Sequence, residues 1–133
     1  MDDTALFQGV CDCIRQTLEK DLPDMRETDR LIADLGADSL DFLDLIFRLE
    51  RAFDVRVNPR DLERRTREAL GSAPMIVDGR YTPQAVAELK KAMPEVPEGE
   101  LYPDMPATLL AGSFRVKTFM NLVEYARSHG GSL

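Results

Sequence analysis

Residues 35–45 read LGADSLDFLDL, a glycine-containing loop that runs into a helical pattern with one serine among acids. Gly36 can adopt the backbone angles that a tight loop needs, and Asp38 is a preferred helix N-cap. The residues that follow, as far as Phe53, contain neither glycine nor proline. The stretch therefore predicts a helix that has Ser39 in its first turn and continues to Phe53.

The position of Ser39 suits a phosphate ester. In the first turn of a helix, the hydroxyl lies beside backbone N–H groups that have no helical acceptor, at the positive end of the helix dipole. The sequence has no Gly-x-Ser-x-Gly elbow, and its only histidine, His129, lies near the C-terminal end. We therefore interpret Ser39 as an attachment point rather than the nucleophile of a hydrolase.

The predicted helix has two different faces when its residues are placed at intervals of about 100°. The apolar face, wide enough to pack on a core, consists of Phe42, Leu45, Ile46, Leu49 and Phe53. The polar stripe consists of Asp41, Asp44, Arg48 and Arg51, edged by Leu40 and Phe47. Acids beside exposed apolar residues are typical of a docking surface for a basic partner, and the alternative is a solvated helix face.

Three parts of this region, residues 35–41, 43–45 and 49–53, together resemble the phosphopantetheine attachment motif and second helix of acyl carrier proteins. The resemblance indicates a specialised member with a large insert before the last helix. It implies that 4′-phosphopantetheine from coenzyme A esterifies Ser39, next to Asp38 and Leu40, and that the thiol of this arm carries an acyl thioester. The partner-binding residues that it implies are Asp41, Asp44, Phe47 and Glu50. Arg48 and Arg51 depart from the more uniformly acidic helix of typical members.

The resemblance implies a carrier rather than an enzyme, with no catalytic residue and no metal. The expected partners are a phosphopantetheinyl transferase, an acyl ligase or acyltransferase, a ketosynthase and other enzymes of fatty-acid or polyketide-type biosynthesis. We expect a monomer. Two alternatives stay open: an aminoacyl or peptidyl carrier, which shares the serine and the four-helix plan, and an unmodified interaction module in which Ser39 is only a helix residue.

The bulk properties exclude several classes of partner. The chain has 133 residues, enough for one domain, and we expect residues 1–133 to form a single acyl-carrier-like domain. Its formal net charge is −7 and its pI is near 4.7, which argues against nucleic acid and anionic membranes as partners. The start of the sequence lacks the pattern of a leader, and no stretch is long and apolar enough to span a bilayer, so a cytoplasmic protein without membrane insertion is expected.

The rest of the sequence predicts an all-α fold, an acyl-carrier-like four-helix bundle with a long first loop over residues 21–37. Apolar residues at helical spacing predict further helices over residues 4–20, 60–70 and 118–128. Asn58 is expected to cap the third helix, with Pro59 at its first position. In the first helix, Cys11 is predicted to lie in the core and Cys13 on its flank, and their spacing of two residues disfavours a disulfide.

Residues 72–112 form the insert, an inserted helical and irregular segment between helices three and four. Its sequence predicts a small hairpin or an extended turn about Asp78-Gly79, a helix capped by Thr82-Pro83 that ends near Met93, and an irregular segment after it. We expect the insert to fold back onto the domain. One hypothesis is that its apolar residues shelter a long or unusual acyl chain, and the alternative is a surface addition that packs on the third helix. These apolar residues are Val86, Leu89, Met93, Leu101, Leu109 and Leu110.

Overall fold

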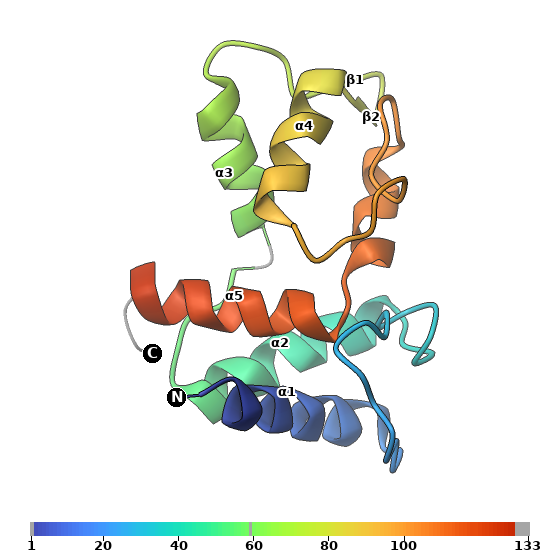
Figure 1. Ribbon diagram of the computed structural model, residues 1–133, viewed down its shortest axis with the longest axis vertical. Helices are drawn as coiled ribbons and strands as arrows, with labels where there is room; N and C mark the ends of the chain where they lie inside the picture. Colours follow the sequence, from blue (N-terminus) through green and yellow to red (C-terminus); the bar gives the residue numbers. More distant parts are fainter. Residues whose placement is uncertain (1, 59, 130–133) are drawn as a thin grey trace. The chain divides into compact units, whose positions relative to one another are not determined.

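The structure, a computed structural model, describes residues 2–58 and 60–129 (Figure 1). It divides into two compact units. The first unit contains α1 (Asp3–Leu18), α2 (Ser39–Phe53) and α5 (Val116–His129). The second unit contains α3 (Asp61–Leu70), β1 (Ile76–Val77), β2 (Arg80–Tyr81), α4 (Pro83–Ala92) and the 3₁₀ helix η1 (Ala107–Ser113). The predicted all-α class, with a long first loop and an inserted helical and irregular segment, is confirmed.

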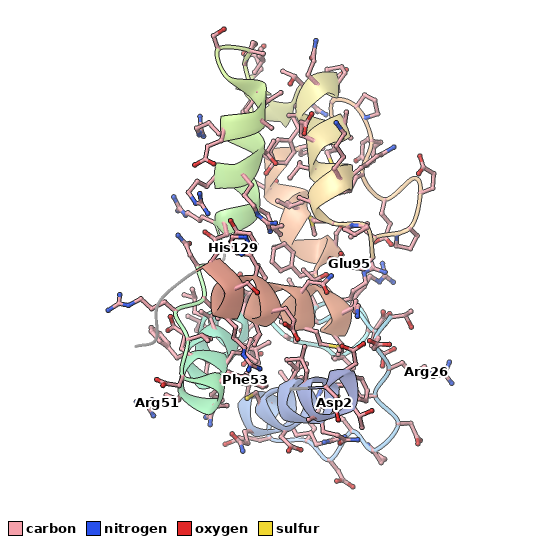
Figure 2. All side chains as sticks on the ribbon, turned by 60° about the vertical axis from the view of Figure 1, so that its left-hand side comes forward. Asp2, Arg26, Arg51, Phe53, Glu95 and His129 are labelled. Carbon is pink, nitrogen blue, oxygen red and sulfur yellow. The ribbon has the colours of Figure 1, made fainter. Side chains whose placement is uncertain are left out.

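In the first unit, α1 packs against both α2 and α5. The apolar face predicted for α2 is buried at Leu45, Ile46 and Leu49 and half-buried at Phe42 and Phe53. The ring of Phe53 lies so close to Gly9 that a Cβ built on the glycine would come within 2.6 Å of it. Figure 2 shows Phe53 between α2 and α1. A glycine on α1 therefore lets the two helices approach at this point.

Both cysteines of α1 are buried, so the prediction that Cys13 lies on the flank is wrong. Cys13 follows Leu6 by seven residues, or about two helical turns, and both side chains therefore lie on the same face of the helix. Burial raises the pKa of each thiol to about 11. Both cysteines are free thiols that pack as small apolar residues.

The long loop after α1 is hydrogen-bonded to the start of α5. Leu31 N–H donates to Phe114 O at 3.0 Å, and two further backbone bonds run from residues 116 and 117 to residues 29 and 27, at 3.0 and 2.9 Å. Ala37 N–H then donates back to Leu31 O at 3.1 Å. Leu31 and Leu35 are buried, as expected for a loop held on the core. These contacts fix the chain that leads into α2.

In the second unit, α3 packs on α4, as the alternative interpretation of the insert predicted. The predicted hairpin is confirmed, because β1 pairs antiparallel with β2 and both residues of the turn, Asp78 and Gly79, have positive φ (53° and 76°). The predicted cap of α4 is also confirmed: Thr82 Oγ1 accepts from Ala85 N–H at 3.2 Å, with Pro83 as the first helical residue.

Two details of the second unit differ from expectation. α3 begins at Asp61 with Arg60 as its N-cap, so Asn58 does not cap it, and Pro59 lies outside the described residues. Five of the six apolar insert residues are buried, but Leu109 is 50% exposed. Sheltering of an acyl chain stays a hypothesis, as does the single domain. Among the described residues, no helix has the length and apolarity needed to cross a bilayer.

Candidate functional site

Ser39 is the first residue of α2, and a reciprocal pair of side-chain bonds fixes the helix start there. The carboxylate of Asp38 accepts from Asp41 N–H at 2.9 Å, and the carboxylate of Asp41 accepts from Asp38 N–H at 3.0 Å. This capping box satisfies donors that would otherwise lack a partner at the helix end. Ser39 itself is exposed, and its hydroxyl has no hydrogen-bond partner among the described residues.

The first turn of α2 keeps two backbone donors available. Phe42 N–H donates to Asp38 O at 3.1 Å, and Asp41 N–H is taken by the capping box. The N–H groups of Ser39 and Leu40 have no acceptor in the described part of the chain. Together with the helix dipole, these two donors can hold an anionic oxygen beside the Ser39 hydroxyl. A phosphodiester on Ser39 therefore fits the residues present.

A hydrogen-bonded glycine and an aromatic cluster lie on either side of Ser39 in the chain. Gly36 adopts a φ of 82°, which favours glycine, and its N–H donates to Ile32 O at 3.1 Å. On the other side of Ser39, the ring of Phe42 lies 5.3 and 5.6 Å from the rings of Phe114 and Phe119 (between centroids). The third pair of this aromatic cluster, Phe114 with Phe119, lies at 5.7 Å. Ser39 is thus an exposed residue at a helix end that is held by local hydrogen bonds and by the aromatic cluster.

The three acids predicted to bind partners all have partners within the chain. Asp41 is held in the capping box. Asp44 accepts from the Arg48 guanidinium at 2.8 Å, and this hydrogen bond lowers the pKa of Asp44 and raises that of Arg48. Glu50 accepts from Val57 N–H at 3.0 Å and so anchors the chain that follows α2. The roles of Asp41 and Glu50 in local structure were missed by the sequence analysis, and their contacts with partners stay a prediction.

An exposed apolar row runs along α2 from the Ser39 end. Leu40 is 76% exposed, Leu43 54% and Phe47 65%. The sequence analysis did not assign Leu43 to the docking surface, although its spacing of three residues from Leu40 and four from Phe47 could have shown that it lies on the same side. Beside Phe47, a shallow hollow is lined by Asp44, Phe47, Arg48 and Arg51.

Comparison with known proteins finds a family whose match includes Ser39. Residues 8–72 match a family described as "Phosphopantetheine attachment site". The acyl carrier protein of Thermotoga maritima is 42% identical over 59 residues, which cover 44% of this chain and 73% of the relative. The acyl carrier protein AcpXL of Rhizobium etli is 40% identical over 65 residues, which cover 49% of this chain and 67% of the relative.

Other similar proteins are matched over a smaller share of their length. AcpXL of Rhizobium meliloti is 41% identical over 54 residues, or 41% of this chain, and the chain spans only 57% of that relative. No solved structure matches the chain significantly. The family match, over residues 8–72, includes α2 and the candidate site.

Proposed function

The chain belongs to the acyl carrier protein family, and on that premise we propose that it carries acyl groups as thioesters on a 4′-phosphopantetheine arm attached to Ser39. The pathway that we propose is fatty-acid or polyketide-type biosynthesis. Members of the family hold this group covalently. The observation that carries the proposal is an exposed Ser39 hydroxyl at the start of α2, beside two backbone N–H groups that have no acceptor among the described residues.

Each residue at the site has a task in this proposal. Ser39 supplies the oxygen that forms the ester. The N–H groups of Ser39 and Leu40 can donate hydrogen bonds to an anionic oxygen of the phosphodiester. Asp38 fixes the helix start through Asp41, so that these donors stay in place. The attached group supplies a thiol at the end of a flexible arm.

Tethering the acyl group to a carrier protein raises its local concentration at an enzyme site. An acyl group on a flexible arm meets an enzyme site at a high local concentration once the carrier protein has docked. The protein itself then decides which enzymes receive the group, through the surface that it presents next to the arm. On this chain that surface is the exposed side of α2, and the partners that we propose are a phosphopantetheinyl transferase, an acyl ligase or acyltransferase, and a ketosynthase.

Intact-mass spectrometry after incubation with coenzyme A and a broad-specificity phosphopantetheinyl transferase tests the attachment site. Wild type should gain one phosphopantetheine, and Ser39→Ala should gain none. Ser72→Ala, which changes another exposed serine, is the matched control and should be modified like wild type. Well-folded wild type that stays unmodified with several transferases would contradict the proposal and favour an unmodified interaction module.

The modified protein also separates acyl from aminoacyl carriers. An acyl ligase supplied with fatty acids should load the arm, whereas amino-acid-adenylating enzymes should not. Loading by the adenylating enzymes alone would assign the chain to the aminoacyl or peptidyl carriers instead.

A further inference from the structure

The loop between α1 and α2 forms a hollow on the surface of the first unit. The volume of this hollow is about 230 Å³, and all of its lining comes from the loop. Apolar walls together with a few hydrogen-bond acceptors are the usual composition of a small-molecule site. The lining has both, with four apolar side chains and two acids: Leu22, Pro23, Met25 and Leu35, and Asp24 and Asp29.

Hydrogen bonds hold the walls of this hollow on two sides. On the α1 side, Arg15 Nε donates to Leu22 O at 3.3 Å. On the α5 side, Val116 N–H donates to Asp29 O at 3.0 Å, and the Asp29 carboxylate accepts from Arg26 N–H at 2.8 Å. The loop is therefore already shaped before a ligand binds, which lowers the entropy lost on binding.

Leu22 has a backbone conformation that is costly for a leucine. Its φ is 43°, in the left-handed region that bulky residues rarely adopt. Its side chain is half-buried and lines the hollow. Backbone strain of this kind concentrates at active sites and at sites that hold ligands. The strain at Leu22 therefore marks the hollow, rather than the rest of the loop, as the place to look for a ligand.

The hollow lies within reach of a group attached to Ser39. Leu35, in its lining, precedes Ser39 by four residues, so their Cα atoms are at most about 14 Å apart. The start of the loop comes close to its end, because a Cβ built on Gly36 would lie 3.4 Å from Lys20 Nζ. Figure 1 shows the loop leaving the end of α1 and returning to the start of α2. An extended phosphopantetheine arm is longer than the separation between Leu35 and Ser39.

We infer that the hollow holds the pantothenate part of the phosphopantetheine arm while the carrier is not docked on an enzyme; this inference rests on the proposed attachment at Ser39. The pantothenate part carries two methyl groups, a hydroxyl and amide N–H groups. Its methyl groups suit the apolar walls, and the Asp24 carboxylate can accept from the hydroxyl or from an N–H. Asp24 is exposed and has no hydrogen-bond or ion-pair partner among the described residues.

The size and polarity of the hollow favour the arm over a long acyl chain. Its volume of about 230 Å³ is below the roughly 300–1,000 Å³ of sites that bury a drug-sized ligand. A long acyl chain would extend beyond it, and an alkyl chain would also take water from Asp24 and Asp29 without offering a hydrogen bond in return. The pantothenate part precedes the thiol in the arm, so the thioester stays outside the hollow, where an enzyme can reach it.

Nuclear magnetic resonance of protein that carries an arm labelled with ¹⁵N at its two amides tests this inference. A held arm should give order parameters above about 0.6 for these amides, whereas a flexible arm gives lower values. Asp24→Ala should lower them below that value, because the arm loses an acceptor. Asp21→Ala removes another exposed acid of the loop, outside the hollow, and should leave them unchanged.

A second variant removes an apolar wall without straining the loop. Leu22→Gly suits a φ of 43°, so it should stay folded by circular dichroism and still lower the order parameters of the arm. In the wild-type protein, nuclear Overhauser effects should connect the methyl protons of the arm with the side chains of Leu22 and Leu35. Loading a long acyl group should leave these contacts in place.

Three results would overturn the inference. The first is an arm in the wild-type protein whose amides have order parameters below about 0.6. The second is a loss of order in Asp21→Ala equal to that in Asp24→Ala. The third is contact between the loop and the acyl carbons in place of the methyl groups of the arm. Failure of the proposed function is distinguishable from all three, because Ser39 would then gain no adduct in the intact mass.

Discussion

The aromatic cluster of Phe42, Phe114 and Phe119 should decide how firmly the Ser39 end of α2 is held. Phe42 lies one turn after Ser39, and its ring contacts both other rings. Phe42→Ala removes a half-buried ring. We therefore expect it to lower the free energy of unfolding by about 3 kcal/mol, the lower end of the range for such truncations. Phe42→Leu keeps most of the apolar area but loses two ring pairs, which cost about 1–2 kcal/mol together.

Hydrogen exchange measured by mass spectrometry on peptides from α2 can check these values, because it reports the stability of this helix directly. If α2 exchanges through unfolding of the structure that the cluster holds, Phe42→Ala should speed exchange by about two orders of magnitude, since 1.4 kcal/mol is a factor of ten. Phe42→Leu should speed it by about one. Exchange in Phe42→Ala within threefold of wild type, or equal to that of Phe42→Leu, would refute the claim that ring packing anchors this end of α2.

Three further predictions concern the helix cap, the loop glycine and the two buried thiols. Asp38→Ala should lower the free energy of unfolding by about 1 kcal/mol in urea titrations, because Asp41 N–H loses its acceptor. Asp38→Asn should have a free energy of unfolding close to that of wild type, because asparagine also caps helices well. Gly36→Ala should cost about 1 kcal/mol by the same measurement, because φ is 82°. The free thiols of Cys11 and Cys13, with pKa values raised to about 11, should resist iodoacetamide at pH 8 while the protein is folded. Since the unfolded thiols ionise first, stability should fall as pH rises from about 8.5 to 11.

The candidate site could be predicted from the sequence because its determinants are local. The loop glycine, the capping acid and the serine lie within four residues of one another, and each follows from a rule about helix ends. The hairpin at Asp78-Gly79 and the cap at Thr82-Pro83 were predictable for the same reason. In all three places the backbone conformation is set by neighbours in sequence, so no knowledge of distant contacts was needed.

The start of α3 was predicted less well than that of α2, and its packing on α4 was predicted only as one of two alternatives. Asn58-Pro59 has the composition of a helix start, yet the helix begins at Asp61. α3 packs on α4, which lies more than a dozen residues further along the chain. An apolar stripe shows that a helix has a buried side but does not identify the element that covers it. The hairpin between α3 and α4, which the sequence did predict, is the connection that brings them together.

The charge pattern of α2 shows a different limit of prediction from sequence. Counting charges along the helix gave an acidic docking surface, because a sequence shows which residues are ionised and not which are already bonded. Asp44 and Arg48 are four residues apart, and that spacing alone allows the ion pair. The bond from Val57 N–H to Glu50, in contrast, depends on how the chain turns after the helix ends. A hydrogen bond from a backbone N–H orients a carboxylate but leaves it charged, so Asp41 and Glu50 still contribute to the surface charge of α2 while they also hold its two ends.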